Sequence, residues 1–460
     1  MPEFDAAYPT IEDLQRLLTQ RALSVTDTIQ ASLQRIAELA PLLNAVINVS
    51  HSALDEARSA DERIQRGGEL RPLEGVPLIL KDNIDTAGLL TTLGSELFRQ
   101  RIPDSDARCA AALRDAGAIV VAKANMNEFA SGGDGANEAF GRVRNPWATD
   151  RSSGGSSSGC GAALAVGACV IAVGSDTRGS GRIPAAACGV VGYRPSYGLI
   201  SREGVAPRAL TLDTLSPMAR TARDVASVAA ALVGPADLAD LVEWTSDDDS
   251  GPTAERLVAG TVVGVPSEDG LSQCSSAVVE NFAHAVDTFR ELGAKVVDWS
   301  LPRVDAAKLA RLLEAEFAKY YGLDSTELDR VGSTVRAEFE RGSRVSTSEY
   351  VSLLEYRNSV ERDARRLSES FDAWLTPTLS GTAMAMTGEG AGARFIGPFT
   401  QWPTAAHLPA ISVPSGFDSE GLPTAVQIVA PAGRDSTCLR LAGAFQMVTG
   451  HHLERPSPAA

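Results

Sequence analysis

Apolar residues recur along this chain in two rhythms, one typical of amphipathic helices and one typical of buried strands. The helical rhythm opens the sequence and predicts a helix whose apolar face carries Ile29, Leu33, Ile36 and Ala40. Ser24 or Thr26 is expected to cap the start of this helix, and Pro41 to follow its end. A second helix is predicted over residues 52–65, closed by Gly67 and Gly68.

Short apolar runs bounded by turn residues then alternate with helical segments. Strands are predicted over residues 75–80, 118–122, 170–173, 261–265, 372–376, 410–413 and 424–429. Helices are predicted over residues 107–116, 277–292 and much of 305–371, with a closing helix through Leu441, Phe445 and Val448. The polar segment 246–252 is expected to be a hinge or surface loop. This alternation favours an α/β architecture whose sheet is covered by helices on both faces.

Composition and charge narrow the classes of function. Hydrophobic residues make up 44% of the 460-residue chain and the formal net charge is −16. A sizeable core is therefore expected, while nucleic acid and anionic membrane surfaces would be repelled. The N-terminus lacks an apolar signal core, and the longest apolar stretch, residues 164–174, is about half of what spans a bilayer. We therefore predict a cytoplasmic enzyme. Its six cysteines form no CxxC pair, so no metal site, redox motif or cofactor is expected.

Residues 131–161 interrupt the alternation with a segment rich in Gly, Ser, Asn and Asp. This segment contains Gly154-Gly-Ser-Ser-Ser-Gly159, and a second cluster at 174–181 follows the strand predicted at 170–173. Glycines let the backbone approach a ligand, and serines can act as nucleophile or proton relay. A flexible linker would have the same composition. A phosphate cradle of the P-loop type is disfavoured because no lysine follows the glycines.

A serine nucleophile needs a base, either a histidine or a lysine. Residues 155–159 match the G-x-S-x-G elbow with Ser157 at its centre, but an elbow follows a strand, whereas residues 145–151 are turn-like. None of the five histidines lies in a polar constellation, which disfavours a Ser-His-Asp triad. Lysine is the remaining base. Lys81 ends an apolar strand, where burial would lower its pKa, although a lysine there can also reach solvent.

Several segments together resemble the amidase signature family of serine hydrolases. They are Gly75-Val-Pro-Leu-Ile-Leu-Lys-Asp-Asn83, the cluster at 154–159, Gly174-Ser-Asp-Thr-Arg-Gly-Ser-Gly-Arg-Ile-Pro-Ala185, and residues 188–198, 375–378 and 409–414. The likeness runs from about residue 10 to about residue 455, with the three central motifs in the family's order and spacing. It implies a single large domain over residues 1–460, built on a central twisted mixed β-sheet. The parts expected are N-terminal helices at 10–67, a signature core at 75–205, a substrate-shaping helical cap at about 300–371, and C-terminal strands and a helix at 372–450.

The resemblance also implies roles by position. Lys81 matches the catalytic lysine, Ser156 the bridging serine that follows a cis peptide bond in relatives, and Ser180 the nucleophile. The backbone N–H groups expected to stabilise an oxyanion are those of Thr177, Arg178, Gly179 and Ser180. The side chains expected to support the site are Ser157, Asp176 and Arg182.

Some positions depart from the family's pattern. Arg178 stands where relatives usually have Gly, and Gly181 where they often have Ile, while Ser158-Gly-Cys160 replaces the commoner Gly-Gly-Ser. The Arg178 side chain either enters the site or pairs at the surface. Thr404 and His407 replace an Asn and a Gly in a segment that shapes the acyl pocket in relatives, so substrate choice should differ. Candidate pocket walls, each of which would also suit a core position, are Met126, Phe399 and Trp402.

Three functions are compatible with the sequence to different degrees. The leading one is a hydrolase that cleaves the C–N bond of a small-molecule amide through an acyl-enzyme on Ser180; carbamates (urethanes), anilides and esters present the same carbonyl. The second is the amidase subunit of a glutamyl-tRNA amidotransferase-like complex, which residues 123–129 and 145–147 favour and the changes at Arg178, Gly181 and Thr404 disfavour. A non-catalytic binding relative is disfavoured because all three relay residues are present. The expected partner is a small-molecule substrate, not nucleic acid or membrane, and a homodimer is compatible with the sequence.

Overall fold

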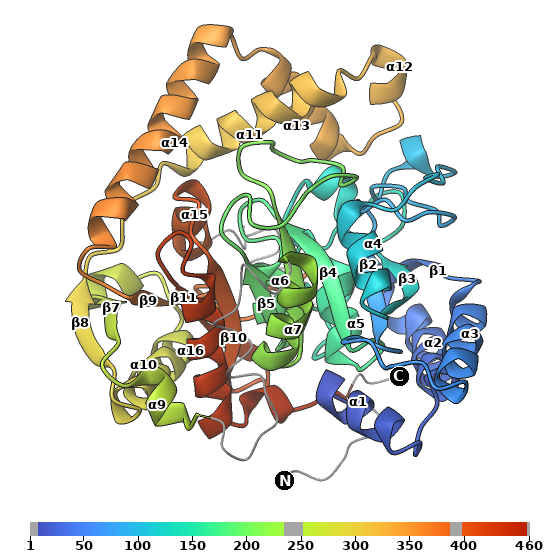
Figure 1. Ribbon diagram of the computed structural model, residues 1–460. Helices are drawn as coiled ribbons and strands as arrows, with labels where there is room; N and C mark the ends of the chain where they lie inside the picture. Colours follow the sequence, from blue (N-terminus) through green and yellow to red (C-terminus); the bar gives the residue numbers. More distant parts are fainter. Residues whose placement is uncertain (1–7, 234–251, 387–397, 458–460) are drawn as a thin grey trace.

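The computed structural model describes residues 8–233, 252–386 and 398–457. Within these ranges eleven strands form one sheet in the order β1-β3-β2-β4-β6-β5-β10-β11-β9-β7-β8 (Figure 1). The strands are β1 (Val46–Val49), β2 (Pro77–Lys81), β3 (Ile119–Ala124), β4 (Ile171–Asp176), β5 (Val191–Arg194), β6 (Thr214–Ala219), β7 (Val262–Pro266), β8 (Lys295–Trp299), β9 (Ala373–Pro377), β10 (Ala410–Phe417) and β11 (Pro423–Val429).

The sheet is mixed. β2 pairs in parallel with β3 and β4, and β7 pairs in parallel with β8 and β9. Between these two parallel groups, β6, β5, β10 and β11 pair antiparallel with their neighbours. The expected mixed sheet is therefore confirmed.

Helices connect the strands and cover the sheet. They are α1 (Ile11–Thr19), α2 (Val25–Leu43), α3 (Ala53–Gln65), α4 (Arg108–Asp115), α5 (Ser158–Ala165), α6 (Arg182–Cys188), α7 (Ala222–Val233), α9 (Ala254–Val258), α10 (Ser276–Glu291), α11 (Ala306–Tyr321), α12 (Ser325–Leu328), α13 (Ser333–Ser343), α14 (Thr347–Leu367), α15 (Pro398–Ala405) and α16 (Asp435–Val448). We call α11–α14 the cap; these helices stand above the sheet at the top of Figure 1.

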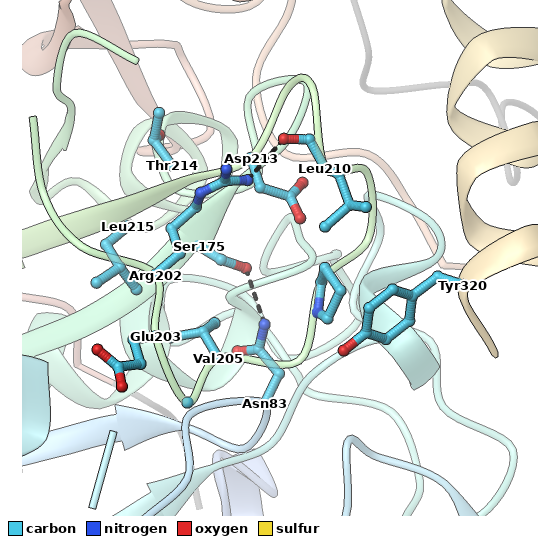
Figure 2. Close-up of a pocket in the computed structure, with 12 residues that line it drawn as sticks. Asn83, Ser175, Arg202, Glu203, Val205, Leu210, Asp213, Thr214, Leu215 and Tyr320 are labelled. Carbon is cyan, nitrogen blue, oxygen red and sulfur yellow. Dashed lines mark hydrogen bonds between the residues drawn. The ribbon is translucent and has the colours of Figure 1, made fainter. Parts of the chain in front are cut away.

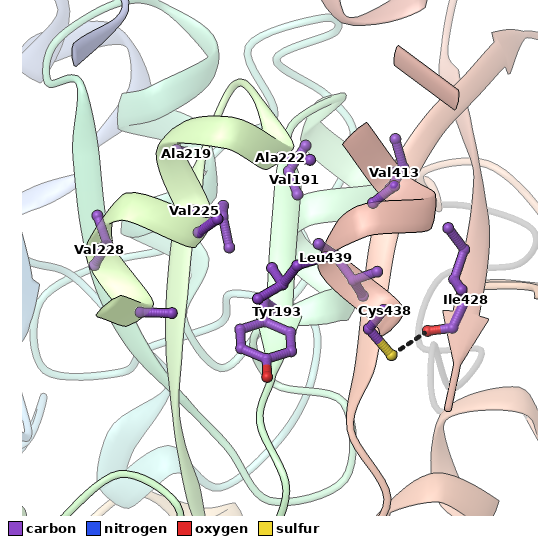
Figure 3. Packing of buried hydrophobic residues seen from close by; sticks show 14 of the residues in the cluster. Val191, Tyr193, Ala219, Ala222, Val225, Val228, Val413, Ile428, Cys438 and Leu439 are labelled. Atoms are coloured by element: carbon purple, nitrogen blue, oxygen red, sulfur yellow. Dashed lines mark hydrogen bonds between the residues drawn. The ribbon is translucent and has the colours of Figure 1, made fainter. Parts of the chain in front are cut away.

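Side chains of alternate strand residues enter different core clusters, which shows that both faces of the sheet are covered. In β2, Leu78 and Leu80 join one cluster, whereas Ile79 joins the other. Residues of α4, α7, α10 and α16 fill the first cluster, and residues of α2, α3, α5 and α6 fill the second. Figure 3 shows part of the first cluster, where α7 and α16 pack on strands from the middle of the sheet. The predicted α/β class with helices on both faces is confirmed.

Individual elements depart from prediction in small ways. Pro41 does not follow α2 but lies inside its last turn. Ser24 is the N-terminal cap, because its hydroxyl accepts a hydrogen bond from the Asp27 N–H at 3.0 Å. The strand predicted over residues 75–80 is β2, which begins at Pro77 and includes Lys81 as its last residue. Most of the hinge predicted at 246–252 lies outside the described residues.

Candidate active site

Lys81 is the last residue of β2 and is fully buried. Its Nζ donates hydrogen bonds to Ser156 Oγ and to Ser175 Oγ, each at 2.8 Å. Because β2 lies beside β4, with Leu80 opposite Val173, the ends of the two strands bring Lys81 and Ser175 together. Removal from water disfavours the charged ammonium, so burial lowers the pKa of Lys81 from 10.5 to about 8.

Ser156 lies in the Gly/Ser loop that precedes α5, and the Gly155–Ser156 peptide bond is cis. This loop is tightly packed, since a Cβ on Gly155 would lie 2.2 Å from Asn127 Oδ1. The next residue anchors the loop: the Ser157 N–H donates to the Ser180 carbonyl at 3.1 Å, and its hydroxyl donates to the Ser175 carbonyl at 3.1 Å. Ser157 is thus a buried structural contact, and no strand lies in the described residues 131–156 directly before it, as the elbow alternative requires.

The loop that carries Ser180 follows β4 and is held by Asp176. The Asp176 carboxylate accepts the backbone N–H of Gly179 at 2.8 Å and that of Gly181 at 3.2 Å. It also accepts from Arg182 Nε at 2.9 Å. These buried donors and the nearby Arg194 outweigh desolvation and hold the pKa of Asp176 well below its usual range. The resulting network fixes the loop between β4 and α6.

Gly181 has a steric reason to differ from the family's frequent Ile. A Cβ on Gly181 would lie 1.9 Å from Ser216 Oγ, and this hydroxyl donates to the Tyr193 carbonyl at 2.8 Å. Ser216 on β6 therefore occupies the space that a side chain at position 181 would need. Thr404, another departure, accepts a hydrogen bond from Arg182 Nη2 at 3.1 Å and so supports the same loop.

Ser180 lies at a small opening, 7% exposed, whereas Lys81 and Ser156 are fully buried. Gly155, Thr177 and Arg178 line the opening together with Ser180. Arg178, Leu313 and Glu338 also line a larger chamber of about 370 Å³ beneath the cap. A chamber of this size is in the range of small-molecule sites.

The predicted site residues are only partly assembled around this opening. Thr177, Arg178 and Ser180 line it, but the Gly179 N–H is already donated to Asp176, which corrects the prediction that it faces a substrate oxygen. The Arg178 carbonyl accepts from Thr400 Oγ1 at 2.9 Å, and its side chain lines both the opening and the chamber.

The candidate pocket walls lie elsewhere. Met126 is fully buried, and Trp402 is 1% exposed, with ring centroids 5.0 Å from Trp299 and 5.1 Å from Trp374. Phe399 borders a different cavity of about 720 Å³ near Ser267. None of the three is among the described residues that line the Ser180 opening.

Several residues that shape the site are not among the predicted site residues. Ser175 and Asn83 sit inside the family-like motifs, and Asn83 Nδ2 donates to Ser175 Oγ at 3.3 Å. Asp213 accepts from Thr177 Oγ1 at 2.7 Å, and burial raises the pKa of this carboxyl. Arg208 and Glu338 line the Ser180 opening from distant parts of the chain, and no local spacing connects them.

Another cavity, of about 420 Å³, is lined in part by Ser175 (Figure 2). Asn83, Ser175 and Asp213 line its inner part, and the exposed Leu210 and Tyr320 lie at its edge. Lys81 does not line this cavity. Its hydrogen bond to Ser175, which also accepts one from Asn83, connects it to the cavity wall.

Features typical of metal sites and membrane spans have no counterpart in residues 8–233, 252–386 and 398–457. Among these residues, no group of three or more His, Cys, Asp or Glu side chains is arranged to hold a metal ion. Within the same ranges no helix is both long enough and apolar enough to cross a membrane.

His407, which replaces a Gly common in relatives, packs against other side chains. It stacks on Tyr197 with ring centroids 4.2 Å apart and contacts Arg357. Burial first, and then the Arg357 cation, lower the pKa of His407 to about 4.

Comparisons with known proteins agree with this fold and identify the family. A family model described as Amidase matches residues 27–439. The chain is 36% identical, over 96% of its length and 97% of the relative, to a glutamyl-tRNA(Gln) amidotransferase subunit from Symbiobacterium thermophilum. Its fold is similar to the peptide amidase of Stenotrophomonas maltophilia, with a TM-score of 0.85 and 29% identity over 99% of both chains. It is also similar to the corresponding glutamyl-tRNA(Gln) amidotransferase subunit from Thermotoga maritima, with a TM-score of 0.81 and 29% identity over 100% of both chains.

Proposed function

Because the chain belongs to the amidase signature family, we propose that it is a hydrolase that cleaves the C–N bond of a small-molecule amide through an acyl-enzyme on Ser180. The observation that carries this proposal is the buried contact of Lys81 Nζ with Ser156 Oγ at 2.8 Å, in a loop hydrogen-bonded to Ser180. A fully buried lysine that makes no ion pair with a described carboxylate is suited to act as a base.

In the proposed reaction, neutral Lys81 takes a proton from Ser156, which takes one from Ser180 as its oxygen attacks the carbonyl carbon. A pKa of about 8 leaves roughly a tenth of Lys81 neutral at pH 7, which is enough for general-base catalysis. Proton return through Ser156 protonates the leaving nitrogen. Water then hydrolyses the acyl-enzyme and regenerates Ser180.

The oxyanion would be stabilised by backbone N–H groups of the loop after β4. Thr177, Arg178 and Ser180 line the opening, whereas the Gly179 N–H is engaged by Asp176. Each such donor is typically worth about 3–4 kcal/mol of transition-state stabilisation. Carbamates, anilides and esters place their carbonyl against the same donors, so these substrates belong to the proposed range.

A second candidate function is the amidase subunit of a glutamyl-tRNA amidotransferase-like complex. It is favoured by the 36% identity to the amidotransferase subunit from Symbiobacterium thermophilum over nearly the whole chain. In that case glutamine would be the amide, and activity would require partner proteins. Arg178 at the opening distinguishes this chain from the usual family pattern and favours the stand-alone hydrolase.

The test is hydrolysis by the purified chain of an aliphatic amide, an anilide, a carbamate of the same amine, the matching ester, and glutamine. Ser180→Ala should abolish amine release. Ser157→Ala is the matched control, because it removes a neighbouring hydroxyl that donates to a backbone carbonyl.

A serine-reactive phosphonate should label Ser180, and the mass of the labelled peptide should identify the modified residue. Activity restricted to glutamine with added partners would favour the second function, and full activity of Ser180→Ala would refute the nucleophile.

A further inference from the structure

Arg208 lies in the segment between β5 and β6 and connects the sheet to the cap. Its side chain is 3% exposed, and its Cζ lies 4.3 Å from the ring centroid of Phe317 on α11. Its Nη2 donates to Glu338 on α13 at 2.5 Å. The Arg208 backbone N–H donates to Asp213 at 2.7 Å, the carboxyl that also accepts from Thr177. The guanidinium is therefore fixed relative to the loop that carries Ser180.

One end of this guanidinium has no hydrogen-bond partner in the part of the chain that the structure describes. Arg208 Nη1 is buried and has no hydrogen bond to any described residue, although Arg208 lines the same opening as Ser180. Buried N–H groups are nearly always paired, because leaving one unmade is costly. The missing acceptor is thus expected from a molecule that enters the opening.

The charged residues at the opening are compatible with an anionic ligand. Among the described residues that line it they are Arg178, Arg208 and Glu338, and Glu338 pairs with Arg208. Glu338 engages Nη2 alone and also accepts the Ser131 hydroxyl, so it leaves Nη1 without an acceptor among the described residues.

The larger chamber beyond the opening contains more acids, but these are engaged by the protein. Glu314 pairs with Arg341, Asp134 pairs with Arg142, Glu138 accepts from Ser333, and Glu128 accepts from Ser95 and Gly332. The unused hydrogen-bonding capacity at the Ser180 opening is therefore a donor on a cation, which matches an anionic acceptor and not an amine.

We propose that Arg208 binds a carboxylate carried by the substrate a few atoms from the scissile carbonyl. Nη1, the end of the guanidinium that no described residue engages, is the atom assigned to the carboxylate, while Glu338 and Phe317 hold the guanidinium in place beside the opening. This inference rests on the proposed hydrolase function. It names the substrate class as amides that carry an acid group, and Arg208 as the residue that selects them.

Paired substrates test this selection. Succinamate and butyramide differ by a carboxylate on the acyl side, and N-acetylglycine and N-ethylacetamide by one on the amine side. In at least one pair the wild type should prefer the acid by about tenfold or more in kcat/KM. Arg208→Met keeps an apolar stem over Phe317, and it should lower kcat/KM for the preferred acid by about 10- to 100-fold. That loss should appear mainly in KM, with less than about threefold change for the neutral partner. Arg208→Lys, a point charge without the fork, should restore only part of the preference.

The matched control is Arg311→Met, which removes one arginine from the cap. Arg311 pairs with Glu349 at 2.8 Å and is not among the described residues that line either the opening or the chamber. It should leave the acid preference unchanged. An equal loss for acid and neutral substrates in Arg208→Met, or no acid preference in the wild type, would overturn the inference by reducing Arg208 to a cap support.

Binding separates this inference from the proposed function. Ser180→Ala should bind succinamate or N-acetylglycine in calorimetry, and Ser180→Ala/Arg208→Met should bind it at least about tenfold more weakly. If no amide is hydrolysed but this difference in binding is found, the carboxylate site stands and the hydrolase proposal fails. If neutral amides are hydrolysed but no acid binds through Arg208, the hydrolase stands and the carboxylate site fails.

Discussion

The protonation of Lys81 should set the pH dependence of amide hydrolysis. Lys81 is buried and its pKa is lowered from 10.5 to about 8, a change that corresponds to about 3 kcal/mol against the charged form. Only the neutral amine can accept a proton, so activity should rise with pH. Below pH 8 kcat/KM should increase about tenfold per pH unit, reach half of its maximum near pH 8, and then level off.

Ser175→Ala sharpens this prediction. Lys81 Nζ donates to Ser175 Oγ at 2.8 Å, and a hydrogen bond to an ionised group favours that ionised form. Its removal should therefore lower the pKa of Lys81 further and move the midpoint of the pH profile downward by about one unit, since such bonds are worth about 1.5–3 kcal/mol. Asn83→Ala is the control, because Asn83 contacts Ser175 and not Lys81, so its midpoint should stay near 8.

The assay is kcat/KM for one anilide, measured from about pH 5.5 to about pH 10.5 at constant ionic strength, with intact folding at each pH checked by circular dichroism. A wild-type midpoint close to the ordinary lysine value of roughly 10 would mean that Lys81 is not the titrating base. A midpoint that moves upward in Ser175→Ala would contradict the assigned direction of the hydrogen bond. A profile that is flat across the range would refute a lysine base altogether.

Three further variants probe the packing around the site. Asp176→Asn removes the buried anion that anchors the Ser180 loop, which should cost about 3–5 kcal/mol; with an unfolding entropy near 1 kcal/mol/K for 460 residues, calorimetry should show Tm falling by about 3–5 °C, and activity should fall by at least about 100-fold. Gly181→Ala should lose activity because its Cβ would lie 1.9 Å from Ser216 Oγ, and adding Ser216→Gly should restore much of the loss in the same assay; no rescue would contradict the steric explanation. Trp402→Ala should also lower Tm by about 3–5 °C, since it removes a buried ring, yet change kcat/KM less than about threefold at room temperature; a large change in KM would return Trp402 to the pocket wall.

The sequence was sufficient for the fold class and for the strand end that carries Lys81, because both depend on contiguous patterns. The apolar run before Lys81 predicts a buried strand end, and the structure shows Lys81 fully buried there. The predicted end of α2 before Pro41 was wrong, because α2 continues to Leu43 with Pro41 inside its last turn. A proline is tolerated there, since little of the helix remains to be disrupted.

Contacts made across the fold could not be predicted in the same way. Glu338 and Ser131 both meet near Arg208, yet they lie 207 positions apart in sequence, and no local spacing connects them. The hydrogen bond from the Gly179 N–H to Asp176 could not be predicted either, because a motif identifies the residues of a loop but not the direction in which each N–H points. Trp402 could be core or pocket by composition, and only its two tryptophan neighbours distinguish the cases.

The route of the chain through the cap has an evolutionary consequence. The cap leaves the sheet after β8 and returns at β9, and both of these strands pair with β7 at one edge of the sheet. Insertions, deletions or exchanges between these two strands leave the register of the remaining sheet intact. Lys81, Ser156 and Ser180 are encoded far upstream of that interval, whereas Leu313 and Glu338 lie within it. Selection can therefore change the cap's contribution to what enters the site without changing the stretch of the gene that encodes the relay.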